Sequence, residues 1–163
     1  MQTFLPFRDF SLSAKALDSK RLNKQIVEAY QILTGRLSNK NHPACLMWEG
    51  NQKTLKEYIL EFCKEYTKRF HKTHKVFIEI SDNDYRDEKE LFLNDSKHDI
   101  NLFIFTHKIN LLRKDYNFYK DKLSLNIPES KLSDYPEGYY WPVCKGITSK
   151  KHTENWIKFS QKS

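Results

Sequence analysis

Hydrophobic residues recur at helical spacing in three long segments of the chain. Leu22, Ile26 and Leu33 mark the first segment. The second contains Leu55, Ile59, Phe62, Tyr66 and Phe70, and the third contains Leu102, Phe105, Ile109 and Leu112. Positions three, four and seven apart lie on one face of an α-helix. The pattern therefore predicts helices over residues 18–34, about 52–70 and about 98–113.

Local signals fix the ends of the first helix. Asp18 is a good N-cap, and Leu17 with Leu22 can form the hydrophobic staple around it. Gly35 has the position of a C′ glycine, which ends a helix in the left-handed conformation. Pro43 follows in the sequence and is suited to the first position of another helix.

The remaining segments carry weaker signals. Residues 75–80 read as a short strand or an extended crossing, residues 82–90 as a loop, and residues 116–119 as a turn. Three prolines and a glycine make the C-terminal part irregular, with a short helix near Trp156. The predicted fold is all-α, a compact single domain of about three main helices with an irregular C-terminal segment.

The composition of the 163-residue chain limits the classes of protein it can belong to. The length predicts one domain over residues 1–163. Cys45, Cys63 and Cys144 are scattered without a C-x-x-C pair, which favours reduced thiols and a cytoplasmic or nuclear location. No apolar run approaches the length of a membrane span, and the first residues lack the order of a signal peptide, so we expect a non-secreted protein without a membrane partner. Abundant Lys, Asn, Phe and Tyr are typical of AT-rich genomes, viral ones included.

The net charge of +7 is unevenly distributed along the chain. Residues 1–80 carry a net +6 and residues 100–163 a net +5, whereas residues 81–99 carry a net −4. We expect an acidic insert over 81–99 that lies away from a basic face, and a basic tail over 145–163. A basic face of this kind indicates a polyanionic partner, nucleic acid first.

One face of the predicted helix over 18–34 collects the candidate chemistry. Arg21, Lys24, Gln25, Glu28 and Gln31 lie on adjacent turns, and Glu28 is the one carboxylate among them. A carboxylate among cations suits a general acid or base, or a stabiliser of developing positive charge. The alternative is an ordinary solvated helix face with i,i+4 ion pairs.

Several motifs resemble one known family. The R-L-x-K-Q-x-x-E run from Arg21 to Glu28 and the N-H-P-A-x-x-M-W run at 41–48 are the most specific. H-K-I-N-L-L-R-K-D at 107–115 and Y-Y-W-P-V at 139–143 support them. Together they resemble the pyrimidine-dimer DNA glycosylases, the family of phage endonuclease V. The resemblance covers about half of the chain and has no counterpart for the acidic insert or the tail.

The resemblance implies an enzyme that extrudes nucleotides and cleaves the N-glycosidic bond at a damaged pyrimidine, with an abasic-site lyase step. It implies an α-amine nucleophile at residue 1, which forms a Schiff base, and a helix glutamate that assists it. The matching residues here are Met1 and Glu28. Because Gln2 is too large for removal of the initiator methionine, Met1 itself would supply the amine, which has a useful neutral fraction at physiological pH.

The partner implied is double-stranded DNA, bound by a monomer without metal or cofactor. The candidate DNA-binding residues are Gln2, Arg21, Lys24, Gln25, His42, His107, Arg113, Lys114 and Trp141. Several have structural alternatives: His42 as a helix-entry cap, Arg113 and Lys114 as helix C-terminal cations, and Trp141, with Tyr139 and Tyr140, as a pin for the C-terminal segment. A zinc site at His71 and His74 is disfavoured, since the usual ligand spacing is absent.

Two other functions stay open at this stage. The chain could be a non-catalytic nucleic-acid-binding module that keeps the fold and the basic face. It could also carry out N-glycosidic chemistry on a free nucleotide, in which case a small closed pocket without a basic groove is expected.

Overall fold

The computed structural model describes residues 2–162, and Met1 and Ser163 lie outside the described part. Helices hold 56% of the chain and the described residues contain no strand, so the all-α prediction is confirmed. The helices in chain order are α1 (Phe10–Ala16), α2 (Ser19–Leu33), α3 (Pro43–Leu46), α4 (Gln52–Phe70), α5 (Lys75–Ile80), α6 (Ile100–Lys114), α7 (Tyr116–Tyr119), the 3₁₀ helix η1 (Glu129–Asp134) and α8 (Ile147–Ser160).

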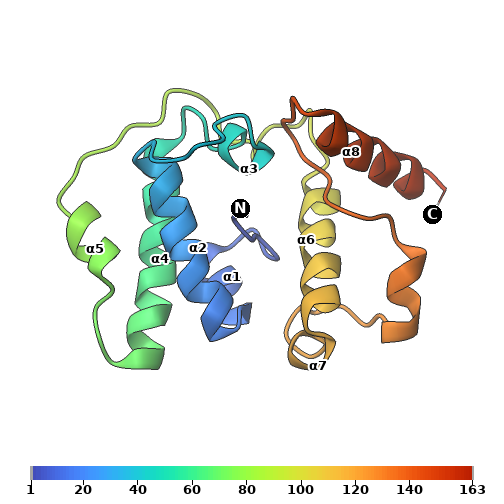
Figure 1. Cartoon of the computed structure of the whole chain (residues 1–163), viewed down its shortest axis with the longest axis horizontal. Helices are drawn as coiled ribbons and strands as arrows, with labels where there is room; N and C mark the ends of the chain where they lie inside the picture. The colour runs from blue at the N-terminus through green and yellow to red at the C-terminus, as the bar shows by residue number, and fades with distance from the viewer. Residues whose placement is uncertain (1, 163) are drawn as a thin grey trace.

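The helices form two groups with the start of the chain between them (Figure 1). In the first group, α1 and α2 pack against α4. Helix α5 contacts α4 and α2 on the side of this group that faces away from the second group. In the second group, α6 contacts α7 and η1, and α8 lies near the end of α6 opposite α7 (Figure 1), where Trp156 packs against Phe105. Buried side chains from both groups belong to one hydrophobic cluster, in which Leu22, Phe62, Phe103 and Trp156 are fully enclosed.

The predicted ends of α2 are confirmed. The Asp18 carboxylate accepts the Arg21 N–H at 2.9 Å, which satisfies one of the unpaired donors of the first turn. Gly35 has a φ of +68°, the left-handed conformation that a C′ glycine adopts without steric cost. Leu17 and Leu22 are both fully buried beside the cap.

The prediction of a strand or extended crossing at residues 75–80 was wrong, since this segment is α5. His74 caps the helix by accepting the Val76 N–H at Nδ1 (3.1 Å). Val76 and Ile80 are the buried positions of the segment. Their four-residue spacing is that of one helix face, whereas the run of β-branched residues had favoured a strand.

The C-terminal segment is more helical than predicted. In place of a short helix near Trp156, α8 runs for 14 residues. The Trp156 side chain is fully buried, and its indole N–H donates to the Gly138 carbonyl at 3.2 Å. Residues 116–119, expected to be a turn, form the single helical turn α7.

The acidic insert is attached to α4 and does not extend freely into solvent. Asn51, the N-cap residue of α4, makes no side-chain cap bond. Instead, the Asp87 carboxylate accepts the Thr54 N–H (3.1 Å) and the Thr54 hydroxyl (2.5 Å). Phe92 and Leu93 from the same insert are buried in the core. Among the described residues, no helix combines the length and apolar character that crossing a membrane requires.

Candidate active site

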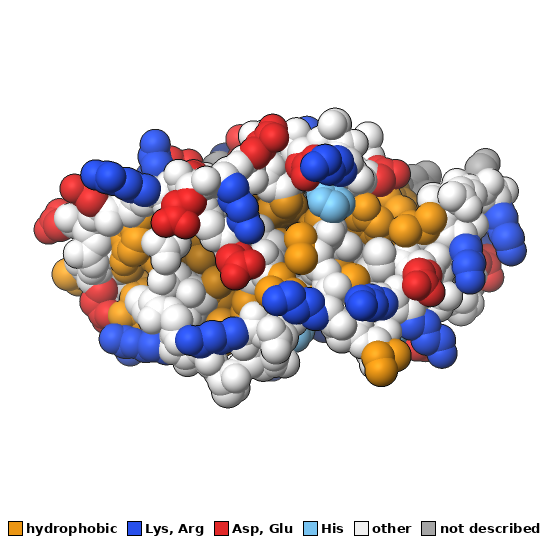
Figure 2. Space-filling model, turned by 90° about the horizontal axis from the view of Figure 1, so that it is seen from above, with side chains coloured by type: hydrophobic (Ala, Val, Ile, Leu, Met, Phe, Trp, Pro, Cys, Tyr) orange, Lys and Arg blue, Asp and Glu red, His pale blue; other side chains and the backbone are white. Residues whose placement is uncertain are grey.

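A cationic cavity of about 430 Å³ opens between α2, α6 and the start of the chain. Its basic side chains come from two helices that are far apart in the sequence: Lys20, Arg21, Lys24 and Lys114. Glu28 is the one acid among the described residues that line it. The face of the molecule seen from above carries interspersed basic and acidic side chains (Figure 2).

Glu28 lies where the first residues of the chain meet α2. Its Oε2 accepts the backbone N–H of Gln2 at 3.0 Å, and its Oε1 lies 3.8 Å from the Lys24 ammonium. The Glu28 side chain keeps 13% of its surface exposed, whereas that of Lys24 keeps 65%. The carboxylate is thus held at the cavity by the peptide that follows residue 1, and the cation reaches outward.

The segment of residues 2–5 extends into the protein along α2. Gln25, which is 1% exposed, accepts the Phe4 N–H with its side-chain oxygen at 2.8 Å. Gln2 is itself buried. The structure places Gln2 and Gln25 in the cavity lining, so these two predicted residues lie together with Glu28.

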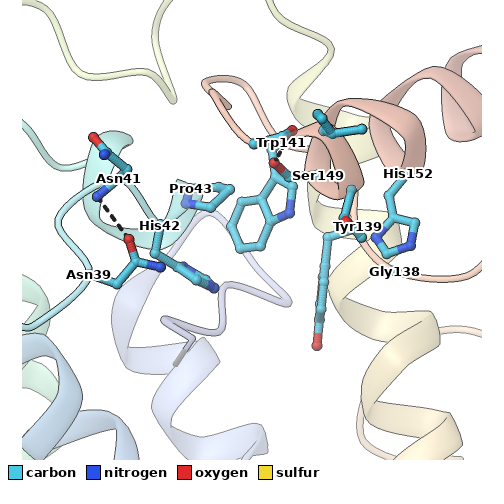
Figure 3. Close-up of a pocket in the computed structure, with 12 residues that line it drawn as sticks. Asn39, Asn41, His42, Pro43, Gly138, Tyr139, Trp141, Ser149 and His152 are labelled. Carbon is cyan, nitrogen blue, oxygen red and sulfur yellow. Dashed lines mark hydrogen bonds between the residues drawn. The ribbon is translucent and has the colours of Figure 1, made fainter.

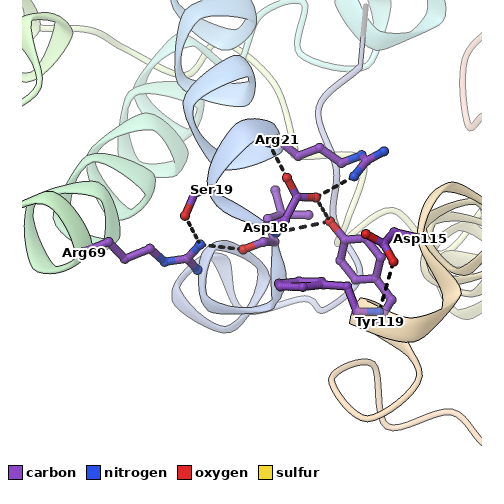
Figure 4. Close-up of polar contacts among 8 residues, drawn as sticks. Asp18, Ser19, Arg21, Arg69, Asp115 and Tyr119 are labelled. Carbon is purple, nitrogen blue, oxygen red and sulfur yellow. Dashed lines mark hydrogen bonds and ion pairs between the residues drawn. The ribbon is translucent and has the colours of Figure 1, made fainter.

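Arg21 is fixed in orientation by its neighbours (Figure 4). Its Nη1 lies 2.6 Å from Oδ2 of Asp18, and its guanidinium lies over the ring of Tyr119, 5.9 Å from the ring centre. Burial would raise the pKa of Asp18, but hydrogen bonds from Tyr119 and Arg21 outweigh it and leave the pKa lowered. Asp18 thus stays charged and holds Arg21 at the cavity.

The two cations at the end of α6 have different surroundings. Lys114 lines the cavity, and burial together with nearby Arg21 and Lys24 lowers the pKa of its ammonium. This mutual effect places the three charges in one cluster. Arg113 instead donates to the carbonyls of Leu132 (2.8 Å), Tyr135 (2.8 Å) and Pro136 (3.0 Å). The structure therefore does not bring Arg113 into the cationic cavity, because its guanidinium is hydrogen-bonded to the C-terminal segment.

His107 is fully buried in the core. Its Nδ1 accepts the Leu5 N–H at 2.9 Å, and burial lowers the pKa of the imidazole to about 3. Its ring packs against Phe4 and Phe103. A side chain without exposed surface cannot reach DNA, so the expected DNA contact of His107 is replaced by a bond to the start of the chain.

A second cavity of about 550 Å³ holds the other two predicted residues, His42 and Trp141. His42 and Pro43 lie on one side, Tyr139 and His152 on the other, and Trp141 lies between them (Figure 3). His42 accepts the Ala44 N–H at Nδ1 (3.1 Å), so it caps α3, and burial lowers its pKa. Trp141 is only 6% exposed. Neither residue lines the cavity of Glu28.

Tyr139 lines both cavities. The sequence indicated it only as a member of an aromatic cluster that could stack on a base, and the list of candidate DNA-binding residues took Trp141 from that cluster. Burial raises the pKa of its hydroxyl. The Y-Y-W run signalled an aromatic cluster, but spacing alone does not show which ring faces a cavity. Lys20 was missed as well, since nothing in the sequence separates it from other exposed lysines.

The described residues contain no group of three or more His, Cys, Asp and Glu side chains that could hold a metal ion. His74 binds Asn23 through Nε2 at 3.1 Å, in addition to capping α5. Burial raises the pKa of the Cys63 thiol to about 12, so this cysteine is a poor thiolate ligand.

These features define an all-α protein in which a helix carboxylate and a cluster of cations surround the first residues of the chain. Residues 1–79 match the family model described as pyrimidine dimer DNA glycosylase. The resemblance noted in the sequence is confirmed over this segment, which is just under half of the chain and contains α1 to α4 and all but the last residue of α5. The motifs at 107–115 and 139–143 lie outside it and stay predictions. No curated protein and no solved structure matches the chain.

Proposed function

We propose that the chain is a DNA glycosylase with abasic-site lyase activity, acting as a monomer on damaged or modified pyrimidines in duplex DNA. The family match over residues 1–79 supports the substrate class. The observation that carries the proposal is the 3.0 Å bond between Glu28 Oε2 and the Gln2 N–H, because it brings a carboxylate to the peptide bond that follows residue 1.

The proposed nucleophile is the α-amine of Met1, which lies outside the described residues. The amine nitrogen forms a bond to C1′ of the damaged nucleotide, and the bond from C1′ to the base breaks. The base leaves with a proton, the sugar ring opens, and an imine joins the protein to C1′. Loss of a C2′ proton then expels the 3′ phosphate, and water hydrolyses the imine.

Glu28 has two tasks in this scheme. Its carboxylate stabilises the positive charge that develops at C1′ and on the imine nitrogen, and it can take up a proton in the lyase step. The bond from Gln2 and the ion pair with Lys24 fix its two oxygens before the substrate arrives. Such preorganisation reduces the rearrangement needed in the transition state.

The cations have a different role, which is to hold the DNA backbone. Arg21, Lys24 and Lys114 would contact phosphates on either side of the damaged nucleotide. Neutralised phosphates release counterions, so we expect binding to weaken steeply with salt. The aromatic wall of Tyr139 lies beside this cluster.

Borohydride trapping tests the proposal. The full chain is mixed with duplexes containing an abasic site or a pyrimidine dimer, reduced, and analysed by mass spectrometry, with the expectation of a covalent adduct at Met1. E28Q should retain DNA binding and lose cleavage by about 100-fold or more, the scale of a lost acid–base group. E57Q, which changes an exposed glutamate of α4, serves as the matched control. Binding without an adduct in the wild type would leave the non-catalytic module as the function.

A further inference from the structure

The first described residues form no regular structure, yet side chains accept all their backbone N–H groups. Gln2 N–H donates to Glu28, and Thr3 N–H to the Gln2 side chain at 3.1 Å. Phe4 N–H donates to Gln25, and Leu5 N–H to His107. We call residues 2–5 the N-terminal segment. Since its N–H acceptors are side chains, single substitutions can remove these bonds one at a time.

Trp48, in the turn after α3, and Tyr58 of α4 also bind this segment. The Trp48 indole N–H donates to the Thr3 hydroxyl oxygen at 3.0 Å, and the Tyr58 hydroxyl donates to the Phe4 carbonyl at 3.1 Å. Trp48 and Tyr58 are both buried. The N-terminal segment is therefore fixed along its length, and α6 contributes one of the bonds through His107.

The His107 ring accepts a hydrogen bond at Nδ1 and donates none to the described residues. Accepting the Leu5 N–H requires the lone pair of Nδ1, so the ring proton is on Nε2. Nε2 has no hydrogen-bond acceptor among the described residues. The rings of Phe4, Phe103 and Tyr139 surround the imidazole at centre distances of 5.9, 4.3 and 5.3 Å. A leucine would fill this apolar site without leaving a buried N–H unpaired. The imidazole differs from leucine in that its Nδ1 can accept the Leu5 N–H.

We propose that His107 is a positioning residue for the start of the chain. By accepting the Leu5 N–H at Nδ1, it fixes the register of the N-terminal segment on α2 and thereby the approach of the Gln2 peptide to Glu28. The proposal rests on the proposed function, in which residue 1 reacts beside Glu28. It also links two regions of the site, since the helix that carries His107 brings Lys114 to the cationic cavity two turns later.

Two amide substitutions at one position separate positioning from mere core packing. Asn places its carbonyl oxygen near the position of Nδ1, whereas Gln places its oxygen near that of Nε2. H107N should therefore keep the bond to Leu5, and H107Q should lose it. We expect single-turnover cleavage of an abasic duplex to fall tenfold or more in H107Q and less than threefold in H107N, with the Kd for DNA within twofold of wild type in both.

Ile109→Ala is the control for lost stability, because Ile109 is buried on the same helix and outside the site. It should cleave at the wild-type rate at temperatures where it is folded. Equal rates for H107Q and wild type, or equal losses in H107Q and H107N, would overturn the positioning role. If H107Q does not fold, H107N alone decides: a loss of tenfold or more in this variant, with its fold intact, contradicts the proposal.

A second measurement separates this inference from the proposed function. The full-length proteins are treated with an amine-selective acylating reagent, and modification of the α-amine at residue 1 is followed by peptide mapping. Release of the N-terminal segment should raise the acylation rate at least threefold in H107Q and leave H107N unchanged. If the wild type traps no imine, the proposed function fails, and an unchanged acylation rate in H107Q removes the positioning role independently.

Discussion

Tyr119 and Asp18 are joined by two hydrogen bonds of opposite direction across 101 residues of sequence. The Tyr119 hydroxyl donates to the Asp18 carboxylate, and the Asp18 N–H donates to the hydroxyl oxygen at 3.2 Å. The pair connects the N-cap of α2 with α7 (Figure 4). Because the same carboxylate holds Arg21, a tyrosine outside the cavity stabilises a cation that lines it.

Y119F should lower the free energy of unfolding by about 1–2 kcal/mol, because it removes both hydrogen bonds of a partly buried pair. Thermal or urea denaturation measures the loss. Y66F, which removes a hydroxyl from α4, is the control and should change the unfolding free energy by less than about 0.5 kcal/mol. An unfolding curve of Y119F identical to the wild type would contradict a stabilising role of the pair.

Lys24 and Lys114 should contribute to DNA binding through charge. K24A and K114A are each expected to weaken binding and to reduce the slope of log K against log salt by about 0.9, the value for one phosphate contact. Fluorescence anisotropy at several salt concentrations gives this slope. K64A, in which the lost lysine pairs with Glu61 on α4, is the control. A slope that stays at the wild-type value in K114A would exclude a phosphate contact there.

Arg113 should behave in the opposite way. R113M leaves three partly buried carbonyls without their charged donor, so we expect about 1–3 kcal/mol less stability. The salt slope of DNA binding should stay at the wild-type value, since the guanidinium is turned toward the C-terminal segment. Denaturation and anisotropy on the same sample separate the two effects, and a reduced slope without a stability loss would reverse the assignment.

His107 should make stability depend on pH. Its pKa is about 3 in the folded protein against 6.5 for the ordinary group, so the unfolded chain binds more protons between these values. The stabilisation is complete above pH 6.5 and is lost as the pH falls toward 3, at up to about 1.4 kcal/mol per pH unit. H107N, which has no titrating ring, should show a shallower decline in urea denaturation between pH 6.5 and 4. Parallel curves would contradict a buried neutral imidazole.

The sequence predicts those parts of the fold that depend on local signals. Asp18 and Gly35 define α2 because a cap and a left-handed glycine act within one turn. Residues 75–80 were misread because β-branched side chains favour a strand locally, whereas burial of Val76 and Ile80 against the first helix group decides in favour of a helix. Helix α8 is held to the protein through buried Trp156, which donates to Gly138, a contact that periodicity does not reveal.

The same division holds for the site. Glu28, Lys24 and Arg21 share one helix face, so their neighbourhood follows from spacing alone. Arg113 and Lys114 are adjacent in sequence. Only the tertiary structure shows that Arg113 donates to backbone carbonyls whereas Lys114 lines the cavity. His107 appeared as a polar residue suited to DNA, because its long-range partner Leu5 is 102 residues away.

The cap that Asp87 provides to α4 bears on how the chain can be divided. Helix α4 lies within the family-matched residues 1–79, but the acid that satisfies its first turn comes from beyond them. A fragment ending at residue 79 would keep the recognisable sequence and lose the side chain that caps its longest helix. The segment matched by the family model therefore takes the side-chain cap of its longest helix from residues beyond its own end.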